Sequence, residues 1–285
     1  METKLPLVTR FAPSPTGLLH LGHAHSALSG WRPARAAGGR FLLRIEDIDP
    51  TRCRRDFIDA ILEDLGWLGL DWDGAVRVQS EHLAEYRTAL DALAARGLLY
   101  PCFCTRADIA RELAASLSAP HGPDGPLYPG TCRRLVQAER AARIAAGEAH
   151  ALRLDMARAL AAAPPGLSHA EEGEGRIACD PARFGDVVLA RKDVPASYHL
   201  CVTHDDALQG VTLVTRGEDL KPATDLHRLL QALMGWPEPV YAHHRLLTDA
   251  TGRRLAKRDR AATLRDLREA GTSPAEARSL AGWPD

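Results

Sequence analysis

The stretch of this sequence that decides its fold is Arg10-Phe11-Ala12-Pro13-Ser14-Pro15-Thr16-Gly17-Leu18-Leu19-His20-Leu21-Gly22-His23. An extended, proline-stiffened segment runs into a small-residue turn and then into two histidines. If a helix begins near Leu19, His20 and His23 lie on one face of its first turn. That turn presents unpaired backbone N–H groups, and Gly17 and Gly22 let a ligand approach the backbone closely. The stretch therefore predicts nucleotide binding, with two imidazoles against a phosphate.

A second run strengthens this prediction. It reads Gly39-Arg40-Phe41-Leu42-Leu43-Arg44-Ile45-Glu46-Asp47-Ile48-Asp49, an apolar strand that ends in a cluster of carboxylates. In a parallel sheet, ligands bind at the carboxyl ends of the strands. The alternative interpretation is a strand followed by a solvated acidic turn.

Strands and helices alternate along most of the chain, which favours an α/β fold with a Rossmann-type parallel sheet. The expected strands are residues 6–11, 40–46, 151–155, 176–192, 198–203 and 211–216. The expected helices are residues 19–36, 52–65, 80–96, 133–147, 205–208 and 220–234, with two short helices in the tail 261–282. Pro33 is expected to kink or end the first helix, because it lacks an N–H and clashes with the preceding turn.

Four segments are predicted from this alternation. They are the first half of a nucleotide-binding fold (1–99), an inserted subdomain (100–190), the second half of the fold (191–247), and a basic turn with a short helical tail (248–285). The inserted subdomain begins where the proline- and glycine-rich loop 120–126 and its flanks break the alternation.

Composition sets limits on the class of protein. The chain has 285 residues, 45% hydrophobic and 26% charged, which is ordinary for a globular protein. No apolar run approaches membrane-spanning length and the N-terminus lacks a signal-peptide pattern, so a cytoplasmic protein without membrane contact is expected. With a net charge of −1, any contact with nucleic acid must rest on local patches.

Three of the six cysteines cluster in sequence: Cys102, Cys104 and Cys132. In a cytoplasmic protein such a cluster favours metal binding over disulfides, and three thiolates supply most of a tetrahedral zinc site. No fourth cysteine is near. His121 is the chemically ordinary fourth ligand, and free thiols are the alternative to a metal site.

The run Arg10 to His23 resembles the ATP-binding signature of class I aminoacyl-tRNA synthetases, and its first eight residues and the run Gly39 to Asp49 resemble the glutamyl branch. The resemblance implies that Gly17, His20, Gly22 and His23 bind ATP and that His20 and His23 are catalytic. It also implies a glutamate site. There Arg10, Tyr198 and Arg216 hold the side-chain carboxylate of glutamate, while Glu46 and the segment Phe11, Ala12, Pro13 and Ser14 hold its α-amino group.

Two further features are implied by the same resemblance. The run Arg254-Leu255-Ala256-Lys257-Arg258 resembles the lysine loop of class I synthetases, with Lys257 as a catalytic and ATP-binding residue. It departs from the family pattern at its first lysine, which is Arg254, and at a serine, which is Ala256. Taken alone it is a solvated basic turn. For the metal site, the resemblance suggests Tyr128 as the fourth ligand, so Tyr128 and His121 remain alternatives.

Only about 25 residues follow Arg260, too few for the helical anticodon-binding part of a glutamyl-tRNA synthetase. This pattern resembles the glutamyl-Q tRNA(Asp) synthetase family. The resemblance implies activation of L-glutamate by ATP and Mg²⁺, transfer of glutamate to the queuosine base of tRNA(Asp), and one structural zinc ion per chain. The alternatives are a minimal enzyme that charges tRNA(Glu) and a non-catalytic tRNA-binding relative.

Overall fold

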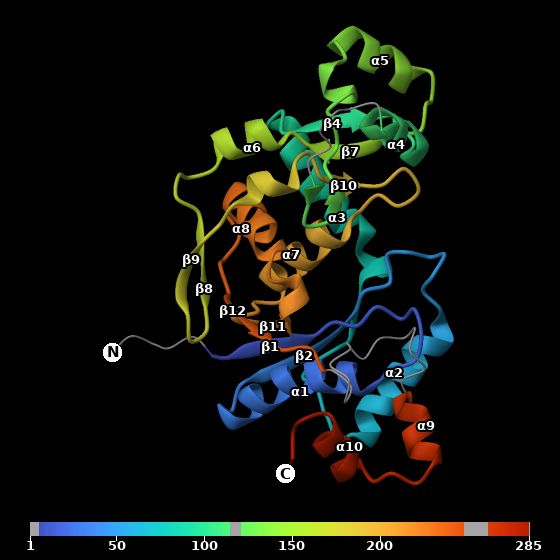
Figure 1. The fold of residues 1–285 in the computed structure, drawn as a ribbon, viewed down its shortest axis with the longest axis vertical. Helices are drawn as coiled ribbons and strands as arrows, with labels where there is room; N and C mark the ends of the chain where they lie inside the picture. The colour runs from blue at the N-terminus through green and yellow to red at the C-terminus, as the bar shows by residue number, and fades with distance from the viewer. Residues whose placement is uncertain (1–5, 115–120, 248–261, 285) are drawn as a thin grey trace.

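The computed structural model describes residues 6–114, 121–247 and 262–284. A parallel sheet lies in the lower half of the molecule as drawn in Figure 1, with the C-terminal helices below it and a smaller antiparallel unit above it. The chain folds so that the ends of several strands lie at one edge of this sheet. The candidate site is built at that edge.

The parallel strands form two hydrogen-bonded groups. The first contains β1 (Val8–Phe11), β2 (Arg40–Ile45) and β3 (Arg77–Val78), in the order β1-β2-β3. The second contains β11 (Leu213–Gly217), β12 (Val240–His244), β8 (Ser168–Glu171) and β9 (Gly175–Ala178), in the order β11-β12-β8-β9, with only β8 and β9 antiparallel.

The two groups meet at β1 and β11. The Thr212 N–H donates to the Val8 carbonyl at 2.9 Å, and the Val8 N–H donates to the Thr212 hydroxyl at 2.9 Å. Strand order therefore changes direction between β1 and β11. In open α/β sheets, ligands bind in the crevice at such a switch point.

Helices cover the sheet and enclose the two largest hydrophobic cores of the described part of the chain. One core lies among α1 (Leu21–Ala36), α2 (Arg55–Trp67), β2 and the C-terminal helices α9 (Leu264–Glu269) and α10 (Pro274–Leu280). The other lies among α3 (Leu83–Ala95), α7 (Tyr198–Leu208), α8 (Ala223–Met234) and the upper unit. The expected helices 19–36, 52–65 and 220–234 and the two tail helices are confirmed to within a few residues.

The upper unit contains an antiparallel sheet with the order β10-β7-β4. Its strands are β4 (Leu99–Cys102), β7 (Ala151–Leu154) and β10 (Val188–Ala190). Around it lie α4 (Arg106–Ala114), the hairpin β5 (His121–Gly122) and β6 (Gly125–Pro126), α5 (Gln137–Ala145) and α6 (Met156–Ala162). In Figure 1, α5 marks the end of the molecule opposite α9 and α10. Short 3₁₀ turns complete the chain at Gln79–His82, Cys132–Arg134, Pro181–Phe184 and Glu218–Leu220.

The expected strand 198–203 is wrong, because these residues form the first half of α7. The Ser197 side chain caps the helix by accepting from the Leu200 N–H. The next residues, Leu200 to Thr203, are all buried between neighbouring elements. A helix buried on several sides shows no clear 3.6-residue period, so its apolar run resembles a strand in the sequence.

Two other expectations are corrected. Residues 176–192 are not one strand, since β9 and β10 are separated by the turn at Pro181–Phe184. The stretch 164–175, for which no strand was expected, contains β8. The first helix does not end at Pro33 but continues to Ala36. Pro33 lies in the last turn, so only three residues of the helix follow the position where its missing N–H removes one intrahelical hydrogen bond.

Within the described ranges, no helix is both long and apolar enough to cross a membrane.

Candidate active site

The two signature histidines lie together at the start of α1. His20 is the N-cap residue, and its Nδ1 accepts from the Gly22 N–H at 3.1 Å, while the His23 Nδ1 accepts from the His20 N–H at 3.1 Å. The ring centroids are 3.9 Å apart. Because each Nδ1 accepts a backbone hydrogen bond, the proton of each neutral imidazole is on Nε2. Both rings are therefore fixed as Nε2 donors beside the N-terminus of a helix.

Gly22 is required by this arrangement. A Cβ atom at this position would lie 2.9 Å from Cε1 of His20 and 3.1 Å from its Nδ1. The sequence predicted that a glycine here admits a ligand, but the neighbour that it accommodates is the His20 ring.

The segment between β1 and α1 is joined to β2 and to the C-terminal tail. The Glu46 N–H donates to the Pro13 carbonyl at 3.0 Å, and the Leu264 N–H donates to the Leu19 carbonyl at 2.8 Å. In the same segment Phe11 and Pro13 are buried, Ala12 and Gly17 are half-buried and Ser14 is exposed. These contacts bring the carboxyl end of β1, the end of β2 and the start of α9 to one place.

Arg10 and Glu46 meet in a buried network of charges. Arg10 donates through Nε to Asp206 Oδ1 at 3.0 Å, and Arg44 donates to the same oxygen at 2.9 Å. Arg44 is fully buried and also lies 3.4 Å from Glu46 Oε1. Arg10 therefore binds Asp206 in this structure, besides being an expected partner of the glutamate carboxylate.

The same network gives two carboxyl groups opposite pKa shifts. Burial raises the pKa of Glu46 to about 7, although Arg44 and Arg10 act against this shift. Burial also acts to raise the pKa of Asp206, but Arg10 and Arg44 outweigh it and hold that pKa below its usual value. Asp206 is therefore the permanent anion, and Glu46 titrates near neutral pH.

The aspartates of α7 are part of the site that sequence reasoning missed. Asp205 is fully buried and accepts from Arg77 at 3.0 Å, Gln79 at 2.9 Å and the Tyr86 hydroxyl at 2.8 Å. The adjacent acidic pair was visible in the sequence but had no partner within reach along the chain. Its partners come from other elements, so only the tertiary structure reveals its role.

Arg216, at the end of β11, is held by three side chains. It donates to His243 Nε2 at 3.1 Å, His227 Nδ1 at 3.0 Å and Thr224 Oγ1 at 2.6 Å. Burial comes first among the causes that keep the pKa of His227 well below its usual value, and the Arg216 charge adds to it. His227 is therefore neutral beside the guanidinium, and Arg216 is fixed in orientation.

A hydrogen-bonded relay continues from Arg216 toward the upper unit. His227 Nε2 lies 3.1 Å from His199 Nδ1, and His199 Nε2 lies 3.2 Å from Asp124 Oδ2. With Arg216 as donor to His227 Nδ1, each further step runs in the same direction, from a ring N–H to the next acceptor. The relay links a cation at the sheet edge to a carboxylate on the hairpin of the upper unit.

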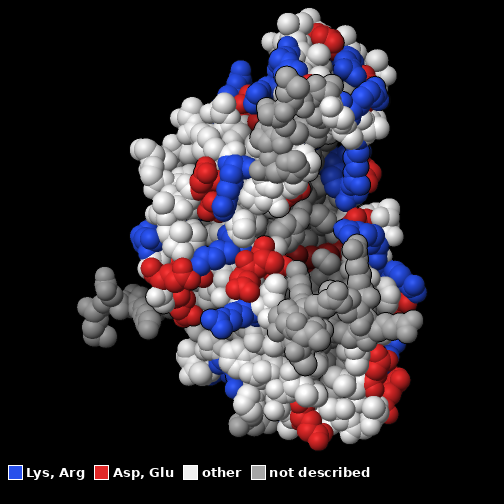
Figure 2. Space-filling view, viewed as in Figure 1, with Lys and Arg blue, Asp and Glu red and all other residues white. Residues whose placement is uncertain are grey.

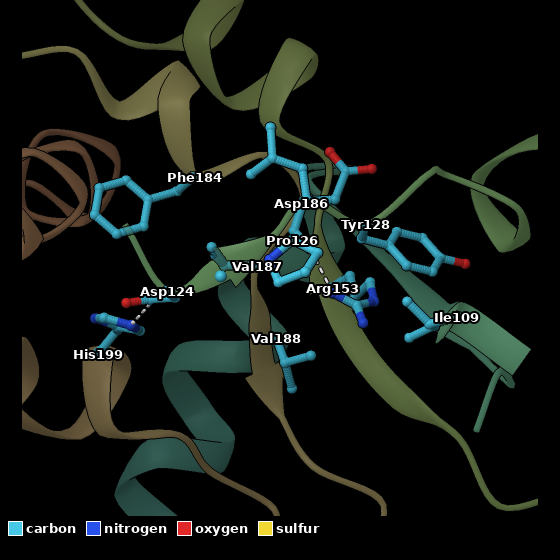
Figure 3. A pocket seen from close by; sticks show the side chains of 12 residues that line it. Ile109, Asp124, Pro126, Tyr128, Arg153, Phe184, Asp186, Val187, Val188 and His199 are labelled. Carbon is cyan, nitrogen blue, oxygen red and sulfur yellow. Dashed lines mark hydrogen bonds and ion pairs between the residues drawn. The ribbon is translucent and has the colours of Figure 1, made fainter. Parts of the chain in front are cut away.

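The outer end of the relay lines a pocket of about 330 Å³. Figure 3 shows His199 and Asp124 facing each other at one end of this pocket, with Tyr128 and Ile109 at the other. Arg153 lies between them with its guanidinium 3.9 Å from the Tyr128 ring centroid. The pocket therefore lies between the relay and the cysteine cluster.

Tyr198 is the first residue of α7 and is 36% exposed. Desolvation raises the pKa of its hydroxyl, and Arg216 and Arg10 act in the opposite direction. These charges act on the hydroxyl because the end of β1, the end of β11 and the start of α7 converge. The structure thus brings together Arg10, Tyr198, Arg216 and Glu46, which are far apart in the sequence.

The three clustered cysteines also come together. Their sulfur atoms all lie within 4.8 Å of one another, and the Cys104 and Cys132 sulfurs are 3.4 Å apart. The Tyr128 hydroxyl lies 3.4 Å from Cys104 Sγ and accepts from the Cys132 N–H at 2.8 Å. Desolvation acts to raise the pKa of Cys132, but hydrogen bonds from Tyr128 and the Phe103 N–H lower it below its usual value.

Lys257 and the rest of the predicted lysine loop lie outside the described residues. The element that follows the loop begins beside the histidines, because Thr263 pairs with His20. On the face drawn in Figure 2, Lys and Arg side chains gather at the α5 end and along the upper right-hand margin, while the larger groups of Asp and Glu lie at the centre, the left and the lower right of the view.

Comparison with known proteins identifies the family of the chain. The family model described as tRNA synthetases class I (E and Q), catalytic domain, matches residues 6–280. A glutamyl-Q tRNA(Asp) synthetase of Rhodobacter capsulatus is 50% identical over 97% of this chain and 100% of its own length. One of Symbiobacterium thermophilum is 48% identical over 94% of this chain and 83% of its own length.

Solved structures show the same fold. The glutamate-tRNA synthetase of Elizabethkingia anophelis has a TM-score of 0.76 and 29% identity over 89% of this chain and 53% of that protein. A glutamate tRNA ligase of Elizabethkingia meningosepticum, solved in complex with its amino acid, has a TM-score of 0.75 over 52% of its length. The present chain thus spans about half the length of these two proteins. The family model and the similar relatives show that the chain belongs to the glutamyl-Q tRNA(Asp) synthetase family of class I synthetase catalytic domains.

Proposed function

We propose that this chain activates L-glutamate with ATP and transfers the glutamyl group to the queuosine base of tRNA(Asp). The observation that carries the proposal is the identity of 50% with a glutamyl-Q tRNA(Asp) synthetase over nearly the whole chain. The convergence of Arg10, Glu46, Tyr198 and Arg216 beside the two signature histidines supports it. Each of these side chains comes from a different element, and together they offer donors and acceptors suited to an amino acid with two carboxylates.

In the proposed mechanism, the α-carboxylate of glutamate attacks the α-phosphorus of ATP and pyrophosphate leaves. His20 and His23 donate from Nε2 to the phosphate oxygens, where negative charge builds up in the transition state. Arg216, fixed by its three partners, pairs with the side-chain carboxylate together with Arg10 and Tyr198. Ionised Glu46 and the backbone near Ala12 receive the α-ammonium group.

Lys257 is proposed to neutralise the departing pyrophosphate. The pairing of Thr263 with His20 supports this role, because Thr263 follows Lys257 closely in the sequence. Mg²⁺ enters with ATP as part of the substrate and offsets the charge of its phosphates.

The cysteine cluster is proposed to hold one structural zinc ion, with Cys102, Cys104, Cys132 and Tyr128 as ligands. Four ligands placed tetrahedrally at about 2.3 Å from a metal lie roughly 3.8 Å apart. The contacts of 3.4 Å from Cys104 to Cys132 and to Tyr128 fit such a set. Tyr128 is preferred here over His121 because its hydroxyl already faces Cys104. The ion would join β4 to the turn at Cys132–Arg134 and so stabilise the proposed inserted subdomain 100–190. In the sequence, this subdomain lies between the two proposed halves of the nucleotide-binding fold, 1–99 and 191–247.

A second candidate function uses the same chemistry with another acceptor. A glutamate-tRNA ligase 2 of Acidithiobacillus ferrooxidans is 42% identical over 94% of this chain, although the chain spans only 56% of that protein. Charging of tRNA(Glu) is therefore the alternative that the test must separate.

The test is transfer of labelled glutamate, with ATP and Mg²⁺, to tRNA from queuosine-proficient and queuosine-deficient cells. Label on tRNA(Asp) from the proficient cells alone, through an alkali-labile bond, is the expected result. Equal labelling of tRNA(Glu) from both sources would instead establish the second candidate.

Glutamate-dependent exchange of pyrophosphate into ATP tests the catalytic residues separately from the acceptor. His23→Ala and Lys257→Ala are each expected to lower kcat of this exchange by ~10²-fold, the scale of losing one transition-state donor. Arg55→Ala, on the exposed face of α2, is the matched control that should retain activity. Unchanged exchange in both active-site variants would contradict the assigned roles.

A further inference from the structure

A second group of metal-ligating side chains lies away from the cysteine cluster and the active site. His169 is on β8, Cys179 directly follows β9, and Asp225 is in the first turn of α8. One ligand atom from each residue lies within 4.8 Å of the others. His169 is 2% exposed and Asp225 is 5% exposed, so the group is enclosed between the β8–β9 hairpin and the helix.

The distances within this group suit a bound cation. His169 Nδ1 lies 3.5 Å from Cys179 Sγ. For a tetrahedral zinc ion with bonds of about 2.0 Å to nitrogen and 2.3 Å to sulfur, the N–S separation is roughly 3.5 Å. Carboxylate, imidazole and thiolate are together a donor set that zinc accepts.

Outer contacts orient two of the three ligands. His169 Nε2, on the side of the ring opposite Cys179, faces Glu171 Oε2 at 3.6 Å, and Glu171 is itself 4% exposed. Metal-ligating histidines commonly direct their second nitrogen at a carboxylate in this way. Asp225 is held through Oδ2 by the Asp180 N–H at 3.0 Å and by Arg183 at 2.7 Å.

The free second nitrogen of His169 supports a cation on the other side of the ring. His169 Nε2 is a buried nitrogen that makes no hydrogen bond within the described part of the chain. A cation bound at Nδ1 would fix the ring proton on Nε2, where it points toward the Glu171 carboxylate at 3.6 Å. A divalent cation would also stabilise a Cys179 thiolate beside the Asp225 carboxylate.

We propose that His169 Nδ1, Cys179 Sγ and the Asp225 carboxylate form a second zinc site, with water as the fourth ligand. On binding, the cation replaces the thiol proton, which passes to solvent. The site joins the β8–β9 hairpin to the start of α8, the helix whose Thr224 and His227 hold Arg216. Its role is to fix that helix against the sheet.

Zinc content of the full chain tests the proposal. The protein is stripped with a chelator, reconstituted with excess zinc, freed of unbound metal by gel filtration and analysed by mass spectrometry for metal. Two zinc ions per chain are expected for the wild type, and one for Cys179→Ser. Cys53→Ser is the matched control: the same chemical change at a half-buried cysteine outside both clusters, with no loss of zinc.

Cobalt(II) provides a second measurement that identifies the site. Cys179→Ser should lose one equivalent of Co²⁺ and keep the absorption of the three-thiolate site, whereas Cys132→Ser should keep the weaker absorption of a one-thiolate site. If Cys179→Ser does not fold, His169→Gln serves in its place, with the same expected loss. Zinc and cobalt contents equal to those of the wild type in a folded variant would overturn the proposal.

Discussion

Glu46 and Asp206 lie in the same buried network of charges, but their different surroundings shift their pKa values in opposite directions. Asp206 receives hydrogen bonds from both Arg10 and Arg44, whereas the Glu46 carboxyl group receives one longer hydrogen bond, of 3.4 Å, from Arg44 among the described residues. The first therefore has a lowered pKa, and the second has its pKa raised to about 7. A carboxyl group that titrates near neutral pH gains a charge when an ammonium group arrives.

The raised pKa of Glu46 predicts that KM for glutamate depends on pH. Because Glu46 is ionised above its pKa of about 7 and protonated below it, KM for glutamate should rise about tenfold between pH 8 and pH 6. The measurement is KM in pyrophosphate exchange at saturating ATP. Glu46→Gln should show a high KM that no longer changes with pH, and a flat profile in the wild type would count against the role of Glu46.

Gly22→Ala tests the packing of the signature histidines. The added Cβ lies 2.9 Å from the His20 ring, so the ring must turn away and lose its bond from the Gly22 N–H. We expect kcat of exchange to fall about tenfold or more with little change in stability. Gly66→Ala, where a Cβ meets no atom within 4 Å, is the control that should leave kcat unchanged.

At the level of elements, α2 carries a buried carboxyl group on the side that faces the C-terminal helix α9. Asp64 is fully buried, neither of its side-chain oxygens has a hydrogen bond in the described residues, and Arg268 of α9 lies 3.8 Å away. Burial raises the pKa of Asp64 to about 6, although Arg268 acts against it. The helix pair is therefore joined across a carboxyl group that is costly to ionise.

The sign of the resulting pH dependence follows from the raised pKa. The folded protein holds the Asp64 proton between about pH 4 and pH 6, so this contribution to stability is lost as pH rises through 6. Asp64→Asn should therefore stabilise the protein by ~1–2 kcal/mol at pH 8 and by nothing at pH 4. Urea unfolding at both pH values measures this, and the exposed Asp59→Asn on the same helix should differ little from the wild type.

At the scale of the whole molecule, a buried network of charges lies between the two large hydrophobic cores, besides the small apolar cluster that joins β1 and β2 to β11 and β12. Arg44 of β2 is fully buried, and its guanidinium group lies against the carboxyl groups of Asp205, Asp206 and Glu46. Arg44 is on β2, which contributes to the core around α1 and α2. Its partners Asp205 and Asp206 are on α7, which contributes to the core around α3 and α8. The network therefore connects the two halves of the nucleotide-binding fold.

Arg44→Met should reveal the strength of this connection. The substitution leaves several buried carboxylates without their cation, and we expect a loss of ~3–5 kcal/mol in the free energy of unfolding. Arg54→Met removes an arginine from an exposed pair and should cost less than about 1 kcal/mol. Denaturant unfolding at pH 7.5 compares the two, and equal losses would contradict a special role of the network.

Much of the fold could be predicted from local sequence. The start of α1, the strands β1 and β2 and the capped helices of the tail depend on residues close together in the chain, so their signals are visible without a structure. α7 was assigned wrongly in its first half because its apolar residues are buried on several sides. The strand β8 was missed although β9, one of its two partners, follows it within a few residues, because the prolines and glycines of residues 164–175 are typical of a loop.

The sequence by itself determined the family, the nucleotide-binding signature and the cysteine cluster, because each is carried by residues that act with near neighbours or by recognisable spacing. Only the tertiary structure decided that Asp206 binds Arg10 across 196 residues and Arg44 across 162 residues. It also decided the relay from Arg216 to Asp124 and the group of His169, Cys179 and Asp225. The physical reason is that these contacts depend on which strands become neighbours, and that order is fixed by packing of the whole chain rather than by local propensity.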